Sequence, residues 1–158
     1  EHRELVTRTV ARALESLQPG YEFAILGFQQ LDSGARYHRW PDNDTLATMS
    51  GKNRAEALRF VRQLGGKFEG SSSVRDALAL AFASPAEAII LLSDGLPNPA
   101  YNGGLPPRAL IQAIVMANTG NKEIHAVTIG DYFRYKGTVE FMENLARANA
   151  GGFMALAQ

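Results

Sequence analysis

The sequence lacks cysteine, and this absence excludes disulfide bonds, thiolate metal sites and a cysteine nucleophile. It also lacks an excess of one charge, because 16 basic and 16 acidic side chains cancel. A global field that would attract nucleic acid or an anionic membrane surface is therefore not expected. No apolar run approaches the roughly 20 residues that span a bilayer, so the sequence predicts no membrane span in this segment. None of these absences indicates the compartment.

What the sequence does contain is typical of one globular domain. Its 158 residues are 46% hydrophobic and 20% charged. A chain of this length buries roughly two-thirds of its unfolded surface on folding. No internal repeat, linker or low-complexity tract divides it, so we predict a single domain over residues 1–158. The chain opens with Glu1 inside a helical pattern, which leads us to expect an upstream segment that this sequence does not contain.

The stretch around which the chain is organised reads EAIILLSDGLPNP, over residues 87–99. Its uninterrupted apolar run, residues 89–92, predicts a strand of a parallel sheet that helices cover on both faces. Ser93, Asp94 and Gly95 end this strand, so the Asp94 carboxylate lies where open α/β sheets bind their ligands. The alternative is that Asp94 only terminates the strand and forms an Asx-turn onto Gly95.

Helical and strand patterns alternate along the rest of the chain. Capping boxes are expected at two helix starts, Asn53 with Glu56 and Ser73 with Asp76. The predicted helices cover residues 2–17, 53–64, 74–83, 108–118 and 138–150, and the predicted strands cover residues 21–28, 35–40, 87–93, 123–129 and 153–157. This order predicts an α/β fold with a three-layer, doubly wound and mostly parallel sheet. Helices would cover both faces, and residues 35–40 would be an antiparallel edge strand.

Five motifs resemble the von Willebrand factor A (vWA) family in order and spacing. They read FAILGF, GSSSVRDAL, IILLSDGLPNP, IHAVTIG and LARANAGGFMAL, and together they extend over nearly the whole chain. The resemblance implies a vWA fold, which is Rossmann-like, over residues 1–158. Each motif is weak alone, and it is their common order that identifies the chain as vWA-like.

The resemblance also implies a metal site of the MIDAS type at the carboxyl end of the sheet. Family members bind a divalent cation there through an Asp-x-Ser-x-Ser turn after the first strand, a Thr and an Asp. In this sequence Ser72 stands at the Thr position and Asp94 at the Asp position. A hydroxyl and a carboxylate are hard oxygen ligands of the kind that Mg²⁺ or Mn²⁺ takes. The implied function is non-enzymatic protein binding, in adhesion or assembly, with an acidic side chain of the partner as the last ligand.

The sequence departs from the family at the first strand, because no Asp-x-Ser-x-Ser pattern occurs anywhere in it. In the family order this strand would lie between residues 21–28 and residues 87–93. Its removal would leave these neighbours roughly 9.6 Å apart, twice the usual spacing of strands. We expect that the strand lies upstream of Glu1, or that another segment fills its place. Without either, residues 1–158 alone are expected to be unfolded or aggregated, because several apolar residues worth about 1.5–3 kcal/mol each would be missing from the core.

Other functions and weaker signals stay as alternatives. A metal-free vWA-like scaffold would bind a partner through its loops, whereas a hydrolase is disfavoured because the sequence has no Gly-x-Ser-x-Gly elbow. His125 is expected to pack within its strand rather than to bind a ligand. His38 is expected on a solvated edge strand, although it could contact an anion. Three aromatic residues could form a rim beside the site or pack over a loop: Tyr132, Phe133 and Tyr135.

Overall fold

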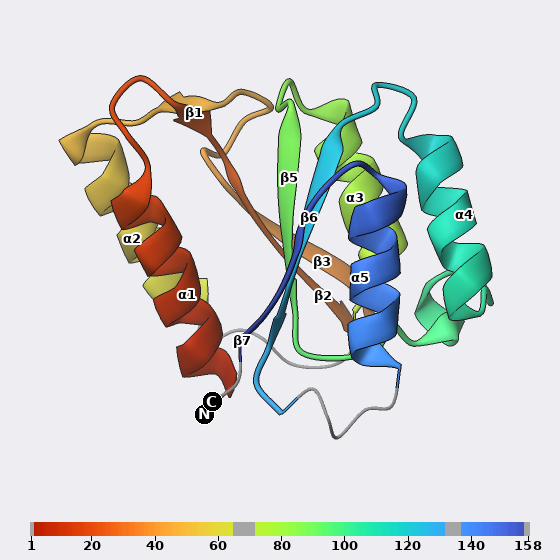
Figure 1. Cartoon of the computed structure of the whole chain (residues 1–158). Helices are drawn as coiled ribbons and strands as arrows, with labels where there is room; N and C mark the ends of the chain where they lie inside the picture. The colour runs from red at the N-terminus through yellow and green to blue at the C-terminus, as the bar shows by residue number, and fades with distance from the viewer. Residues whose placement is uncertain (1, 65–71, 132–136, 157–158) are drawn as a thin grey trace.

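The computed structural model describes residues 2–64, 72–131 and 137–156 (Figure 1). Its elements are, in chain order, α1 (His2–Ser16), β1 (Glu22–Phe23), β2 (Ile25–Leu31), β3 (Gly34–Trp40), β4 (Ala47–Thr48), α2 (Gly51–Leu64), α3 (Val74–Ala83), β5 (Ala88–Ser93), the 3-10 turn η1 (Pro99–Tyr101), α4 (Pro107–Ala117), β6 (Glu123–Ile129), α5 (Thr138–Ala148) and β7 (Phe153–Leu156). The predicted α/β class is confirmed. Within the described ranges no helix is long and apolar enough to cross a membrane.

The best-packed part of the molecule is a parallel sheet in the order β5-β6-β7. Alternate residues of each strand point to opposite faces, and one face lies against α3, α4 and α5. Leu91, Ile124 and Ala126 supply this face, and they are at most 5% exposed. On α5 the apolar residues recur at helical spacing and complete the same core. These residues are Phe141, Met142, Leu145 and Ala146.

The other part of the molecule is a β2–β3 hairpin packed with α1 and α2. The hairpin is antiparallel, as predicted for residues 35–40, and Gly34 adopts a positive φ of 120° at its turn. The short strands β1 and β4 form a further antiparallel pair. The predicted strand over residues 21–28 is therefore wrong in its bounds. It is divided into β1 and β2, because β1 pairs with β4 while β2 pairs with β3.

The start of α2 also differs from the prediction. The helix begins at Gly51, and the Ser50 hydroxyl accepts a hydrogen bond from the Asn53 N–H at 3.1 Å. Ser50 is thus the capping residue, and the prediction that Asn53 caps this helix is wrong. Asn53 instead donates its side-chain amide to the Thr48 carbonyl at 2.8 Å, which ties the helix to β4.

The prediction of one continuous sheet is wrong for the strands that the structure describes. Among these strands β2 pairs with β3 alone and β5 pairs with β6 alone, so the hairpin and the parallel sheet stay separate. No described strand lies between β2 and β5, and backbone hydrogen bonds cannot join strands that are not at the usual spacing of about 4.8 Å. The two parts meet through side chains: α3 contacts β2, and Phe28 packs against the core of the parallel sheet.

The expected burial of residues 89–92 on both faces is wrong as well. Ile90 on β5 is 59% exposed, and Met154 on β7, which the register places on the same face, is 56% exposed. Helices α3, α4 and α5 cover only the opposite face, and α1 contacts β6 without covering these two side chains. The described residues therefore form a parallel sheet with one well-covered face, and the predicted three-layer arrangement is not confirmed.

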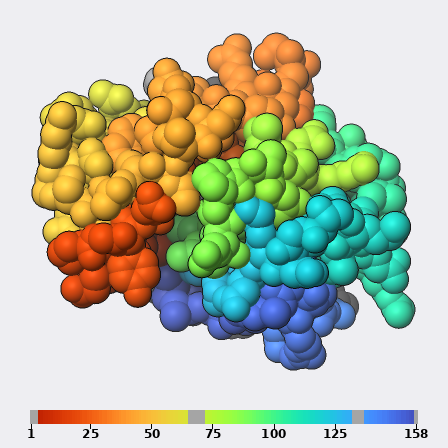
Figure 2. Space-filling model, turned by 90° about the horizontal axis from the view of Figure 1, so that it is seen from above, coloured from red at the N-terminus to blue at the C-terminus, as the bar shows by residue number. Residues whose placement is uncertain are grey.

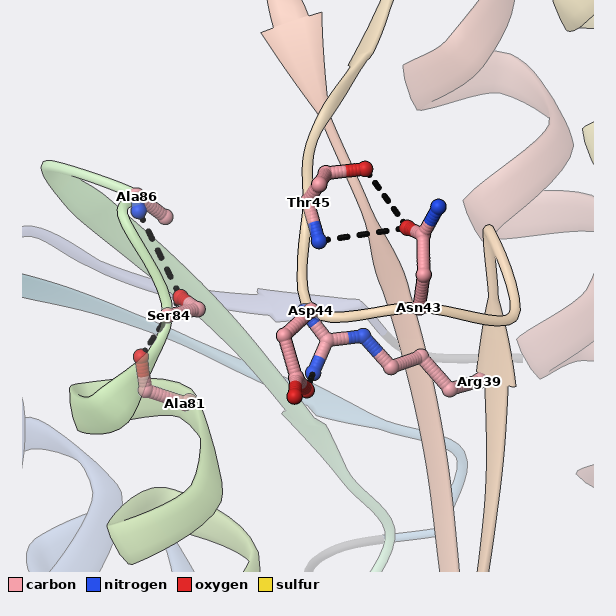
Figure 3. Close-up of polar contacts among 7 residues, drawn as sticks. All are labelled: Arg39, Asn43, Asp44, Thr45, Ala81, Ser84 and Ala86. Atoms are coloured by element: carbon pink, nitrogen blue, oxygen red, sulfur yellow. Dashed lines mark hydrogen bonds and ion pairs between the residues drawn. The ribbon is translucent and has the colours of Figure 1, made fainter.

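Polar contacts near the boundary between the two parts are made within each part (Figure 3). On the hairpin side, Arg39 donates to the Asp44 carboxylate at 2.8 Å. On the other side, the Ser84 hydroxyl donates to the Ala81 carbonyl at 2.7 Å and closes the turn between α3 and β5. From above, the two parts appear as a red-to-yellow lobe and a green-to-blue lobe with a hollow between them (Figure 2).

Candidate functional site

The turn after β5 leaves the Asp94 carboxylate without a partner among the described residues. The Ser93 hydroxyl donates to the Gly95 carbonyl at 3.0 Å and accepts from the Gly95 N–H at 3.4 Å. Ser93 therefore closes the turn, and the alternative in which Asp94 forms an Asx-turn is wrong. Asp94 is exposed at the carboxyl end of β5, where its charge is available to a ligand.

Ser72, the other predicted ligand, lies two residues before the start of α3 and is half-buried. Its hydroxyl makes no hydrogen bond to another described residue, whereas its carbonyl accepts one from Asn102. The helix begins at Val74 with Ser73 as the N-cap, as predicted. The predicted capping box is not formed, because the Ser73 hydroxyl donates to the Asp76 carboxylate at 3.0 Å and bonds no backbone N–H of the helix.

Asn102 connects the two loops that carry these residues. Its side-chain amide donates to the Ser72 carbonyl at 3.0 Å and to the Asn98 carbonyl at 2.8 Å. Its side-chain oxygen accepts from the Arg75 N–H at 3.0 Å. That N–H belongs to the first turn of α3, where no intrahelical acceptor is available. Asn102 thus provides the cap that Ser73 does not provide, from a loop that follows β5.

Sequence reasoning missed Asn102. It stands in an Asn-Gly-Gly stretch, which indicates a loop and nothing more. Its side chain is only 1% exposed because it lies between η1 and the start of α3, two segments about 30 residues apart in the chain. No local pattern could have indicated this burial.

The donor types at this end of the sheet fit a hard divalent cation. The Asp94 carboxylate and the Ser72 hydroxyl are both free of described partners, and Mg²⁺ is commonly bound through one or two carboxylates while it keeps several waters. In the part of the chain that the structure describes, no group of three or more His, Asp and Glu side chains is placed to hold a metal. A cation at this position would therefore need ligands in addition to these two side chains.

The two histidines in strands are engaged in hydrogen bonds. His125 Nδ1 accepts from the Gly152 N–H at 3.0 Å, so a proton on Nε2 is free to bond Glu123 at 3.2 Å. His125 therefore links β6 to the residues before β7, in agreement with a packing role. His38 lies 3.4 Å from the Gln29 side-chain nitrogen, within the hairpin. The predicted aromatic rim, Tyr132, Phe133 and Tyr135, lies outside the described residues.

A hollow of about 270 Å³ lies at the opposite end of the parallel sheet, against the end of α5 and the start of β7. An ion pair between Arg147 and Glu143, 2.7 Å long, forms part of its wall. These side chains are 72% and 45% exposed, so the pair is a solvated surface contact. The hollow includes neither Ser72 nor Asp94 and is separate from the candidate site.

Comparison with known proteins adds no further residue to this site. No family model matches the chain, and no curated protein matches it.

Proposed function

We propose that this chain is a non-enzymatic protein-binding module of the vWA type. In this proposal a divalent cation, Mg²⁺ or Mn²⁺, lies at the carboxyl end of the sheet and accepts an acidic side chain of a partner protein. Ser72 and Asp94 are its proposed ligands. The observation that supports the proposal most directly is the free Asp94 carboxylate at the end of β5, with the Ser72 loop tied to the same region by Asn102.

The two proposed ligands have different roles in binding the cation. Asp94 provides negative charge, which holds a hard cation more strongly than a neutral oxygen does. Ser72 provides a neutral hydroxyl oxygen and orients the ion. When bound, the cation provides the positive charge that attracts the carboxylate of the partner, and no bond is made or broken in either protein. The neutral net charge of the chain would leave recognition to this local site.

The second candidate is a metal-free scaffold of the same type, which binds a partner through its loops. It is favoured by the small number of charged oxygens at the proposed site, where Asp94 is the only carboxylate among the two proposed ligands. The loop after β5 also exposes an apolar side chain, Leu96, which is 36% exposed.

Titration calorimetry with MgCl₂ and MnCl₂ distinguishes the two candidates. We expect the wild type to bind, Asp94→Ala to lose about tenfold or more in affinity, and Ser72→Ala to lose less, because carboxylate charge contributes most to binding a hard cation. Asp44→Ala is the matched control, since this carboxylate is 99% exposed and paired with Arg39 in the other part of the molecule. Circular dichroism confirms that each variant is folded. Unchanged affinity in both folded site variants would favour the metal-free scaffold.

A further inference from the structure

We infer that Asn102 is a positioning residue that couples the loop after β5 to the Ser72 ligand position. The inference rests on the proposed function for what Ser72 binds, whereas the coupling itself rests on hydrogen bonds among described residues. Three contacts of one buried side chain carry it, to Ser72, Arg75 and Asn98.

The chemistry of the contacts suits asparagine. A neutral amide offers two N–H donors and one carbonyl acceptor, and Asn102 uses both donors on carbonyls and its oxygen on a backbone N–H. An aspartate would keep the acceptor and lose both donors, and an alanine would lose all three contacts. Because Asn102 is 1% exposed, water would not easily replace them.

The residue that follows Asn102 packs against the same helix start. Gly103 has a positive φ of 73°, and a Cβ atom there would lie 2.5 Å from Arg75 Nη1. Gly103 therefore lies beside the flexible end of the Arg75 side chain, whereas the Asn102 side chain bonds the backbone at the start of α3. The hydrogen bonds of Asn102, to the Ser72 carbonyl and to the Asn98 carbonyl, therefore carry the connection between Ser72 and the loop.

Such a connection predicts reciprocal coupling. A partner that contacts the exposed part of the loop, at Leu96, would change the position of Ser72 and hence the affinity for the cation. By thermodynamic linkage, the cation would change the affinity for that partner by the same factor.

The test compares Asn102→Ala with Asn118→Ala. Asn118 is a matched control because it is also buried, at 5% exposure, and its side chain makes three hydrogen bonds at the opposite end of the sheet, to Lys122 and Asn149. We expect both variants to lose stability to a similar degree. Only Asn102→Ala should lower Mn²⁺ affinity, by about fivefold or more, and only Asn102→Ala should shift the NMR amide resonances of both Ser72 and Asp94. A purely structural role would give the same pattern in both variants and would overturn the inference.

A second variant keeps the test decisive if Asn102→Ala does not fold. Asn102→Asp retains the acceptor for the Arg75 N–H, so we expect slow hydrogen exchange at Arg75 together with shifted resonances at Ser72. Unshifted Ser72 resonances in this variant would overturn the inference. If the wild type binds no cation, the proposed metal function fails, and the amide shifts measured without metal still decide whether Asn102 couples the loops.

Discussion

The two parts of the molecule differ in the residues that their edge strands carry. Strand β3, at the edge of the hairpin, carries Arg36 and Arg39, and charges of this kind keep edge strands from pairing with other chains. Strand β5, at the edge of the parallel sheet, carries no charge, and its Ile90 is 59% exposed. The sequence of β3 suits an edge, whereas the sequence of β5 suits the interior of a sheet.

The two parts also differ in their cores. Among the described residues, eleven buried residues form the core under the parallel sheet, against four in the cluster between the hairpin, α1 and α2. A hairpin pairs residues that are close in sequence, so a short turn joins its strands without a crossover helix. A parallel sheet needs helical crossovers, and these same crossovers bring the apolar faces of α3, α4 and α5 onto it. We conclude that the part with the parallel sheet contributes most of the stability of the protein.

The largest expected loss of stability is at Gly151, where a substitution would disrupt the parallel sheet. A Cβ atom at this residue would lie 1.9 Å from the Ile124 carbonyl oxygen and 2.4 Å from its carbon. Because both atoms are backbone, Gly151→Ala must displace the start of β7 from β6, and we expect a loss of about 3 kcal/mol or more in the free energy of unfolding. Urea denaturation measures this loss.

Gly152→Ala is the neighbouring control for this prediction. Its Cβ atom would lie 3.6 Å from His125 Nδ1, an ordinary contact. We expect a change within about 1 kcal/mol. Equal midpoints for the two variants would show that β7 does not depend on the close approach of Gly151 to β6.

Replacing one buried leucine by alanine in each part of the molecule compares the two cores directly. Leu145 on α5 is 0% exposed and Leu14 on α1 is 4% exposed. We expect Leu145→Ala to cost about 2–5 kcal/mol and Leu14→Ala to cost less, because the smaller cluster can collapse onto the cavity. Both values come from urea denaturation followed by circular dichroism. A larger loss for Leu14→Ala would reverse the ranking of the two halves.

The smallest expected effect is at Ile90. Since this side chain is 59% exposed, Ile90→Thr should change the free energy of unfolding by about 0.5 kcal/mol or less. It should also reduce aggregation measured by light scattering, because it makes an uncharged edge strand less apolar. The control is Ile124→Thr, a 0% exposed position where a hydroxyl is buried and a large loss is expected. A loss of about 2 kcal/mol or more in the free energy of unfolding for Ile90→Thr would show that its face is covered in solution.

The sequence by itself determined most of the local elements of this protein. The helix over residues 74–83 and the strand over residues 123–129 have the predicted bounds, and the antiparallel strand of the hairpin is where it was expected. These features depend on periodicity, turn residues and caps, which are all read within a few neighbours. At the candidate site the same local signals placed Asp94 at the end of a strand and Ser72 before a helix.

Only the tertiary structure decided which strands pair, which faces are covered and which polar side chains meet. The run at residues 89–92 is apolar on both sides, and nothing within it tells whether a helix or a further strand lies beside it. The separation of β2 from β5, the exposure of Ile90 and the burial of Asn102 all depend on segments far away in the chain. Burial and pairing are properties of two partners in space, and a local pattern contains only one of them.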